Sequence, residues 1–261
     1  MEIQKPNLNT TEYPLNLTSS LVIACICDQG YITHLKTLLR SLRSSNNNLS
    51  VALCLINLNN PKIKKKLISI YPDITFFHIE RNFITPHEKK AFCANYRVIF
   101  LKNLLELCSK NLIYMDVDSI VRNKIDPSIF KNEDDILIHF RDDNDLRFKV
   151  AAGIIFIKNN LKAKRFMDEW EKRILPQMNE WFSDQITFHE TYDAVKEHLN
   201  INHLSSEYID WEFKQESAIW VGKGPRKYKN VLYLLERFRV KRYSLRLNNL
   251  IFKLQALLRN I

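Results

Sequence analysis

Short apolar runs alternate with longer segments of helical spacing along most of this chain. Runs of roughly four to eight apolar residues have the length of buried strands, and apolar residues that recur every three or four positions indicate helices. Such alternation predicts a layered α/β domain with a mainly parallel sheet. We expect strands at residues 21–27, 51–56, 74–79, 112–115, 136–139 and 152–157, and helices at residues 31–43, 61–70, 87–108, 162–174 and 181–192.

The two ends of the chain differ from its middle. Residues 1–19 are polar and rich in Asn and Thr, so we expect a loosely ordered lead-in. Residues 20–228 carry the strand and helix pattern without an internal repeat, which predicts one catalytic domain. Residues 229–261 predict a basic helical tail in two stretches, because apolar residues from Tyr243 to Ile261 recur at helical spacing between Arg and Lys.

The net charge of +10 is concentrated near the C-terminus. From residue 221 onward the chain has eleven Lys or Arg and one acid, Glu236, so the rest is neutral overall. A basic amphipathic helix is typical of a segment that lies on an anionic membrane. We favour this reading over a tail packed on the main domain or a dimer interface. Because no recognised nucleic-acid-binding motif accompanies the charge, we expect no nucleic-acid partner.

Composition excludes several classes of protein. The five cysteines have no C-x-x-C spacing, so we expect free thiols in a reducing compartment and no zinc site. There are four glycines, and neither the dinucleotide-binding nor the Walker pattern occurs. No apolar run is long enough to cross a bilayer, and the first residues lack a signal-peptide core. We therefore expect a cytoplasmic protein.

Two aspartates follow directly after the apolar run at residues 112–115. Asp116 and Asp118 are two residues apart, so their carboxylates point the same way on an extended chain. In α/β sheets ligands bind beyond the carboxyl ends of the strands, and carboxylate oxygens suit Mg²⁺ or Mn²⁺. The Asp-x-Asp pattern therefore predicts a divalent-metal site. The alternative is a solvated turn that holds two aspartates.

The Asp-x-Asp motif and five further motifs form a series that resembles the motifs of GT-A nucleotide-sugar glycosyltransferases. In layout the series is closest to glycosyltransferase family eight. The motifs are Ala24-Cys-Ile-Cys-Asp-Gln-Gly-Tyr31, Asn95-Tyr-Arg97, Tyr114-Met-Asp-Val-Asp118, Ala151-Ala-Gly153, Asp184-Gln185 and Trp220-Val-Gly-Lys-Gly-Pro-Arg-Lys227. They cover residues 20–230 as an ordered series rather than as close identity. The resemblance implies a GT-A fold, which is a mixed, mainly parallel sheet flanked by helices.

The resemblance also implies a role for each motif. The implied donor-binding residues are Asp28, Arg97, Asp116, Gly153, Gly222 and Lys223. Asp184 and Gln185 are implied as the catalytic pair beside the sugar, and Asp116 and Asp118 as the ligands of Mn²⁺ or Mg²⁺. Each assignment has an alternative. Arg97 could be an exposed residue paired with an acid, Asp28 or Asp184 could cap a helix, and Lys223 could be a solvated lysine of the tail.

Two positions depart from the family's pattern. Its C-terminal motif begins with a metal-ligating His where this chain has Trp220, so the metal would rely on the two aspartates, phosphates and water. Its Asn before Ala-Gly is Ala151 here, so the identity of the donor sugar is not carried over. We favour retention of configuration because of the Asp-Gln resemblance. The acidic loop at residues 142–145 is a second candidate, for contact with the acceptor.

These observations predict a metal-dependent glycosyltransferase of the hexosyltransferase type. It would move a sugar from a nucleotide-sugar donor, expected to be a UDP-sugar, to a bacterial-type surface glycan or a lipid-linked glycan, as in polysaccharide or lipooligosaccharide biosynthesis. We expect it on the inner face of the membrane, bound peripherally through the tail. One alternative is a nucleotidyl- or phosphotransferase that uses the same aspartates. Another is a non-catalytic, membrane-associated adaptor with a degenerate GT-A fold.

Overall fold

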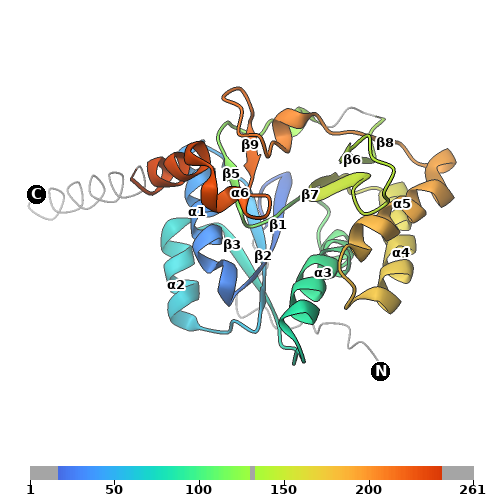
Figure 1. The fold of residues 1–261 in the computed structure, drawn as a ribbon, viewed down its shortest axis with the longest axis horizontal. Helices are drawn as coiled ribbons and strands as arrows, with labels where there is room; N and C mark the ends of the chain where they lie inside the picture. Colours follow the sequence, from blue (N-terminus) through green and yellow to red (C-terminus); the bar gives the residue numbers. More distant parts are fainter. Residues whose placement is uncertain (1–16, 130–132, 243–261) are drawn as a thin grey trace, which may run out of the picture.

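A seven-stranded mixed sheet forms the centre of the protein, whose computed structural model describes residues 17–129 and 133–242 (Figure 1). Long apolar runs form its inner strands because both faces are covered by helices. The strand order is β3-β2-β1-β4-β7-β6-β8. The bounds are β1 (Leu21–Asp28), β2 (Ser50–Ile56), β3 (Ile74–Ile79), β4 (Asn111–Met115), β6 (Ile136–Phe140), β7 (Val150–Ile157) and β8 (Ile201–His203).

The sheet changes direction between β4 and β7. Strands β1 to β4 pair in parallel, whereas β7 runs antiparallel to both β4 and β6. Because Met115 lies opposite Ile154, β7 begins where β4 ends. The main-chain N–H of Asp116 donates to the carbonyl oxygen of Gly153 at 2.8 Å. The two antiparallel pairings also make β6 run in the same direction as β4, so both strands end at the same edge.

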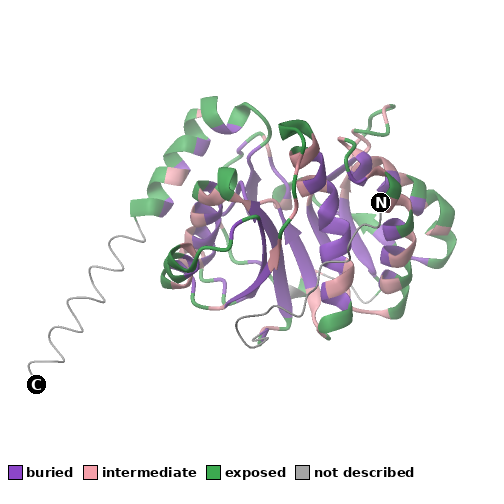
Figure 2. Ribbon diagram, turned by 90° about the horizontal axis from the view of Figure 1, so that it is seen from below, coloured by how far each residue is buried: buried purple, intermediate pink, exposed green. Residues whose placement is uncertain are grey.

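Helices cover the two faces of the sheet unequally (Figures 1 and 2). One face packs against α1 (Ile32–Ser44) and α2 (Pro61–Ile70), and the other against α3 (Pro86–Leu107), α4 (Leu161–Ile174) and α5 (Ser183–Val195). The side chains of Asn60, Thr85 and Asn160 cap α2, α3 and α4, and prolines follow the first two caps. These local signals fix where the helices begin.

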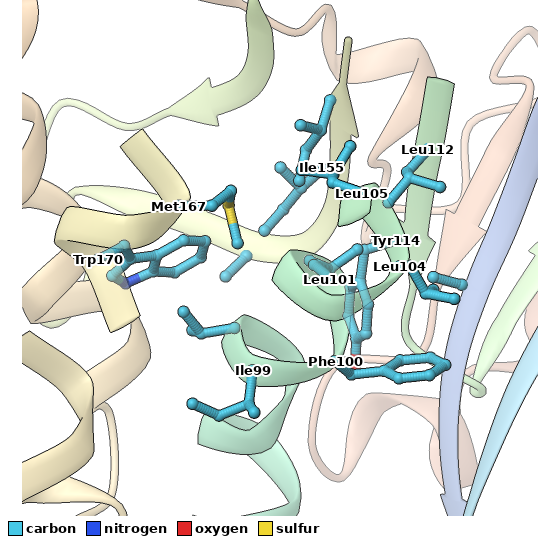
Figure 3. Close-up of a cluster of buried hydrophobic side chains, with 14 of the residues drawn as sticks. Ile99, Phe100, Leu101, Leu104, Leu105, Leu112, Tyr114, Ile155, Met167 and Trp170 are labelled. Atoms are coloured by element: carbon cyan, nitrogen blue, oxygen red, sulfur yellow. The ribbon is translucent and has the colours of Figure 1, made fainter. Parts of the chain in front are cut away.

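Figure 3 shows the core between α3, α4 and the sheet. Phe100 and Leu104 of α3 are fully buried beside Tyr114 of β4, and Trp170 of α4 closes the cluster. Burial of such side chains contributes roughly 1.5–3 kcal/mol each relative to exposure. The apolar contacts hold α3, which carries Arg97, firmly against the strand that carries the aspartates.

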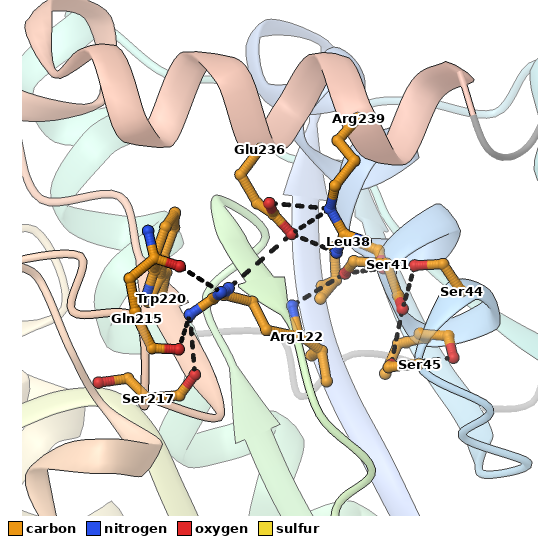
Figure 4. Close-up of polar contacts among 12 residues, drawn as sticks. Leu38, Ser41, Ser44, Ser45, Arg122, Gln215, Ser217, Trp220, Glu236 and Arg239 are labelled. Carbon is orange, nitrogen blue, oxygen red and sulfur yellow. Dashed lines mark hydrogen bonds and ion pairs between the residues drawn. The ribbon is translucent and has the colours of Figure 1, made fainter.

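A second, smaller sheet joins the chain's C-terminal part to the domain. Strand β5 (Ser119–Val121) pairs antiparallel with β9 (Ile219–Val221). Residues 231–242 form a helix that buries Tyr233 and Val240 against Trp220. Figure 4 shows Arg122 between the two parts. Its guanidinium donates to the carbonyl oxygen of Gln215 at 2.6 Å and lies 3.9 Å from a Glu236 oxygen on the helix.

The fold class predicted from the sequence is confirmed, and the expected strands and helices occur with ends shifted by at most three residues. Strand β5 was not expected. The tail was expected as two helical stretches, at about residues 229–239 and 241–260, and the separation between them is wrong, since residues 231–242 form one helix. The five cysteines are free. The lead-in up to residue 16 and the predicted amphipathic stripe at residues 243–261 lie outside the described residues. Within the ranges given above, no helix is both long and apolar enough to cross a membrane.

Candidate active site

A cavity of about 460 Å³ opens at the edge of the sheet where β1 and β4 end and β7 begins. The structure brings together at this cavity every residue assigned to the site from the sequence. The lining includes Asp28, Arg97, Asp116, Asp118, Gly153, Asp184, Gln185, Gly222 and Lys223. Residues from six separate motifs therefore meet in one place, as ligand-binding residues do at the carboxyl edge of an α/β sheet.

Arg97 lies at the base of the cavity and joins two carboxylates. Its side chain is buried on α3, with nitrogens 3.5 Å from Asp116 and 3.4 Å from Asp184. The guanidinium also donates to the carbonyl oxygen of Ala152 and stacks on the ring of Tyr114, 4.7 Å from its centroid. Burial acts to lower the pKa of Arg97, but the neighbouring carboxylates raise it further. The alternative of an exposed arginine paired with an acid is wrong.

Asp118 is buried and held by contacts from the C-terminal part of the chain. Burial, together with the charge of Asp116, raises the pKa of Asp118 to about 6, while Lys227 acts to lower it. The Lys227 ammonium donates to its Oδ2 at 2.7 Å. The main-chain carbonyl oxygen of Asp118 accepts from the Tyr233 hydroxyl at 2.5 Å and from the Gly222 N–H at 3.1 Å. The alternative of a solvated turn does not hold, because Asp118 is buried.

Lys227 is a functional candidate that the sequence analysis did not single out. Its Nζ is buried between Asp118 and the Tyr31 hydroxyl, 3.4 Å away. Lys223, the lysine expected at the diphosphate, lies instead on the ring of Trp211, with Nζ 4.6 Å from the centroid. Both lysines belong to the motif that ends at Lys227. Its last residue was therefore the signal in the sequence that could have identified this lysine.

Asp184 owes its position to Asn95. The amide oxygen of Asn95 accepts from the Asp184 N–H at 3.0 Å, and its nitrogen donates to the carbonyl oxygens of Met178 and Glu180. This fully buried amide ties α3 to the first turn of α5. Burial raises the pKa of Asp184, and Arg97 opposes that shift. Asp184 is not the N-cap, which is Phe182.

Asp28 and Gln185 have partners within the protein as well. One oxygen of Asp28 accepts from the Tyr31 N–H at 3.2 Å and caps the short turn before α1, as the alternative proposed. The other pairs with Lys89 at 2.6 Å. With its amide nitrogen turned toward the carbonyls, Gln185 donates to Val150 at 2.6 Å. Both side chains still line the cavity.

The paired aspartates fit a divalent cation that arrives with a diphosphate. Mg²⁺ is usually bound by one or two carboxylates and completes its shell with water and substrate phosphates. In the part of the chain that the structure describes, no third His, Cys, Asp or Glu completes a group of three. Trp220 offers no ligand, because its Nε1 donates to the Lys214 carbonyl oxygen. Lys227 contacts only Oδ2 of Asp118, so a cation there would use Oδ1 or compete with the lysine for Oδ2.

The acidic loop gives no support for contact with the acceptor. Asp145 pairs with Arg147 and accepts its main-chain N–H, and Asp143 accepts the N–H of Asp145. None of the loop's three aspartates lines the cavity.

Gly222 lies where a side chain would strike the main chain of Asp118. A Cβ there would lie 2.9 Å from the Asp118 carbonyl oxygen and 2.9 Å from the Tyr233 hydroxyl. We expect Gly222→Ala to lower the free energy of unfolding by about 1–3 kcal/mol, as overpacking does. Urea unfolding measures this effect. In the control Gly30→Ala the new Cβ meets only the flexible Asp28 carboxylate, at 3.3 Å. Equal stability of the two variants would contradict the prediction.

Comparisons with known proteins agree with this geometry. Residues 66–233 match the family model of nucleotide-diphospho-sugar transferases. The galactosyltransferase LgtC, solved with donor and acceptor sugar analogs, superposes with a TM-score of 0.58 and 12% identity over 85% of this chain and 95% of that chain. The glycosyltransferase GlyE of Streptococcus pneumoniae TIGR4 superposes with a TM-score of 0.52 and 14% identity over 86% of this chain and 60% of that chain. No curated protein matches by sequence. The two structural similarities show a shared fold.

Proposed function

Because the chain belongs to the nucleotide-diphospho-sugar transferase family, we propose that it moves a hexose from a UDP-sugar to a surface-glycan or lipid-linked glycan acceptor, using a divalent cation and retaining the configuration of the sugar. The observation that carries this proposal is the set of charges at the cavity. Arg97 and Lys227 lie on the two aspartates of the Asp-x-Asp motif, and Gly222 lets the backbone approach closely.

The charge pattern matches the needs of the reaction. When the bond between sugar and diphosphate breaks, negative charge develops on the leaving diphosphate, and fixed cations in a partly dry cavity stabilise it. Lys227 supplies such a group, and Arg97 keeps Asp116 in place. A divalent cation held by Asp116 and Asp118 would add Lewis-acid stabilisation of the same phosphates.

The order of the strands suggests how the donor lies. Asp28 and Tyr31 at the end of β1 would hold the nucleoside, and the aspartates after β4 the diphosphate. The sugar would then lie over Gly153 of β7, where the lack of a side chain leaves room beside Asp116. Asp184, fixed by Asn95 and Arg97, is placed to accept hydrogen bonds from the sugar's hydroxyl groups. Gln185, the next residue, completes the catalytic pair of this proposal.

Binding and turnover of nucleotides test the function. We expect UDP with Mn²⁺ to raise the Tm of the wild-type protein, because a ligand that binds only the folded state stabilises it, by about 2.7 kcal/mol at a hundred times Kd. UDP without metal should have a smaller effect. We also expect slow release of UDP from a UDP-hexose, and an NMR spectrum of the transferred sugar reports whether its configuration is retained.

The same measurements separate the alternatives. A nucleotidyltransferase would consume a nucleoside triphosphate and release pyrophosphate. A non-catalytic adaptor would bind UDP without turnover of any UDP-hexose. If neither nucleoside diphosphates nor triphosphates change the Tm, the proposed function is wrong.

Attachment to an anionic membrane is proposed for the C-terminal tail. In the described part, the helix at residues 231–242 packs inward through Tyr233, whereas Val231, Leu235 and Phe238 are 59–66% exposed. The exposed Arg239, Lys241 and Arg242 lie on the same short helix. Exposed apolar and basic side chains on one helix are typical of a segment bound at the membrane interface. Figure 2 shows the exposed face as green ribbon.

Vesicle sedimentation tests this attachment. We expect the full chain to sediment with phosphatidylglycerol vesicles and not with phosphatidylcholine vesicles, and the binding to weaken with salt. Phe238→Ser should reduce the bound fraction, since it removes an exposed apolar side chain. Ile84→Ser, which changes a side chain that is 92% exposed elsewhere, is the matched control. Equal loss in the two variants, or no binding of the wild type, would reject membrane attachment through this helix.

A further inference from the structure

Two cations at the cavity have no carboxylate within ion-pair distance among the described residues. Arg141 follows directly after β6, and Lys223 follows β9. Both line the cavity and both pack on the ring of Trp211, with Cζ of Arg141 5.0 Å and Nζ of Lys223 4.6 Å from its centroid. An aromatic ring orients a cation without cancelling its charge.

The cavity's other deeply placed cations are neutralised. Lys227 lies on Asp118, Arg97 on Asp116 and Asp184, and Lys89 on Asp28, each within ion-pair distance. Lys90 lies on a ring, that of Trp181, but it is exposed to water at the cavity rim. Arg141 differs from the rest, because it is half-buried and has no carboxylate within ion-pair distance. Lys223 is exposed, but it packs on the same ring beside Arg141.

The two uncompensated cations also repel each other. Burial lowers the pKa of Arg141 although the charge of Asp143 opposes that shift, and burial together with the charges of Arg141 and Arg226 lowers the pKa of Lys223. One nitrogen of Arg141 donates to the Val150 carbonyl oxygen at 3.1 Å, while Nε is buried without a hydrogen-bond partner. Like charges held close together cost free energy until a counter-charge arrives. The pair is therefore suited to an anion that comes from outside the protein.

The position of Arg141 indicates which substrate brings that anion. Strands β4 and β6 end at the same edge of the sheet with β7 between them. Adjacent strands lie about 4.8 Å apart, so the axes of β4, which ends before Asp116, and of β6, which ends before Arg141, lie roughly 10 Å apart. With the diphosphate at Asp116 and the donor sugar over Gly153, Arg141 comes next, where the acceptor must approach.

We propose that the acceptor is a saccharide with a negative charge, either the carboxylate of an acidic sugar or a phosphate ester, and that Arg141 and Lys223 bind this group. The inference rests on the proposed function, because it names the substrate class of the same cavity. It moves Lys223 from the diphosphate, where the motif placed it, to the acceptor. The planar fork of an arginine binds carboxylate and phosphate through two parallel hydrogen bonds, so Arg141 carries most of the recognition.

Matched pairs of probes test this inference. The full chain, saturated with UDP and Mn²⁺, is titrated with methyl glucuronide and methyl glucoside, and separately with glucose 6-phosphate and glucose. We expect the charged member of at least one pair to bind about tenfold more tightly than its neutral twin, and the two pairs distinguish carboxylate from phosphate. Arg141→Gln should reduce that preference to less than about threefold. Arg147→Gln, which changes an exposed arginine of the same loop that pairs with Asp145, should keep it.

The UDP affinity of each variant shows whether the fold is preserved. The inference is overturned if the charged and neutral members bind equally, if no probe binds, or if the preference survives in Arg141→Gln/Lys223→Gln. It is also overturned if the preference is found between UDP-glucuronate and UDP-glucose and not within the acceptor pairs, because the anion would then belong to the donor. If UDP fails to bind the wild-type protein, the proposed function itself is wrong, and this outcome is distinct from the others.

Discussion

Replacing Asp118 with asparagine is expected to lower the rate of sugar transfer by about a hundredfold to a thousandfold, the usual cost of removing one group that stabilises developing charge. Asparagine keeps the shape of the side chain but not its charge. It would therefore lose both the ion pair with Lys227 and the second carboxylate available to a cation. We expect the Mn²⁺-dependent rise in Tm with UDP to disappear as well. Initial rates of UDP release and thermal unfolding measure the two effects.

The matched control for this prediction is Asp142→Asn. Asp142 is exposed and does not line the cavity, so its loss of charge should leave the rate unchanged. Lys227→Met tests whether Asp118 acts only as the partner of the lysine, because that variant leaves both aspartates available to a cation. If Asp118→Asn keeps the metal-dependent rise in Tm, then Asp118 is not a metal ligand.

Arg97→Met is expected to have the largest effect on stability, a loss of about 3–5 kcal/mol in the free energy of unfolding, which is typical of breaking a buried ion pair on one side. Methionine fills much of the volume but leaves Asp184 buried without its cation and removes the donor to Ala152. Urea unfolding at neutral pH measures the loss. Arg165→Met, which changes an exposed arginine on α4, should cost little.

The loss in Arg97→Met should depend on pH. Burial already raises the pKa of Asp184, and without Arg97 that pKa rises further. A carboxyl group with a higher pKa in the folded state binds more protons when folded, so the free energy of unfolding falls as the pH rises from its unfolded pKa to its folded pKa. The variant should therefore lose more stability near pH 8 than near pH 5. An equal loss at both values would mean that lost packing, and not an unpaired carboxylate, is the cause.

Local signals were sufficient for much of the fold. Helix α2 begins and ends where expected because Asn60 caps it and Pro61 starts it. Strand β3 is a mainly apolar run whose first four residues are buried. Strand β5 was missed because its three residues are too few to show a period, and its pairing with β9 joins segments far apart in the chain. Its existence depends on tertiary packing and not on propensity.

The residues of the site were also predicted from local signals in the sequence. Motifs that place an acid or a glycine next to a strand end reveal the edge where ligands bind, and all of these residues line the cavity. The choice between Lys223 and Lys227 could not be made, because both are lysines of one basic loop and 109 residues separate Lys227 from the aspartate that it contacts. Asn95 opens one of the quoted motifs but was given no role, since its four hydrogen bonds reach residues more than eighty positions away.

The hydrogen bond from Tyr233 to the carbonyl oxygen of Asp118 gives the C-terminal helix a second consequence. Because Tyr233 is buried and Glu236 lies 3.9 Å from Arg122 of the small sheet's loop, the helix packs directly against the edge of the sheet that carries the cavity. If the outer face of that helix rests on a bilayer, the cavity stands at a fixed height above the lipid. The protein would then select acceptors by the length of the lipid anchor that carries their sugars, because only acceptors of one length would reach the cavity.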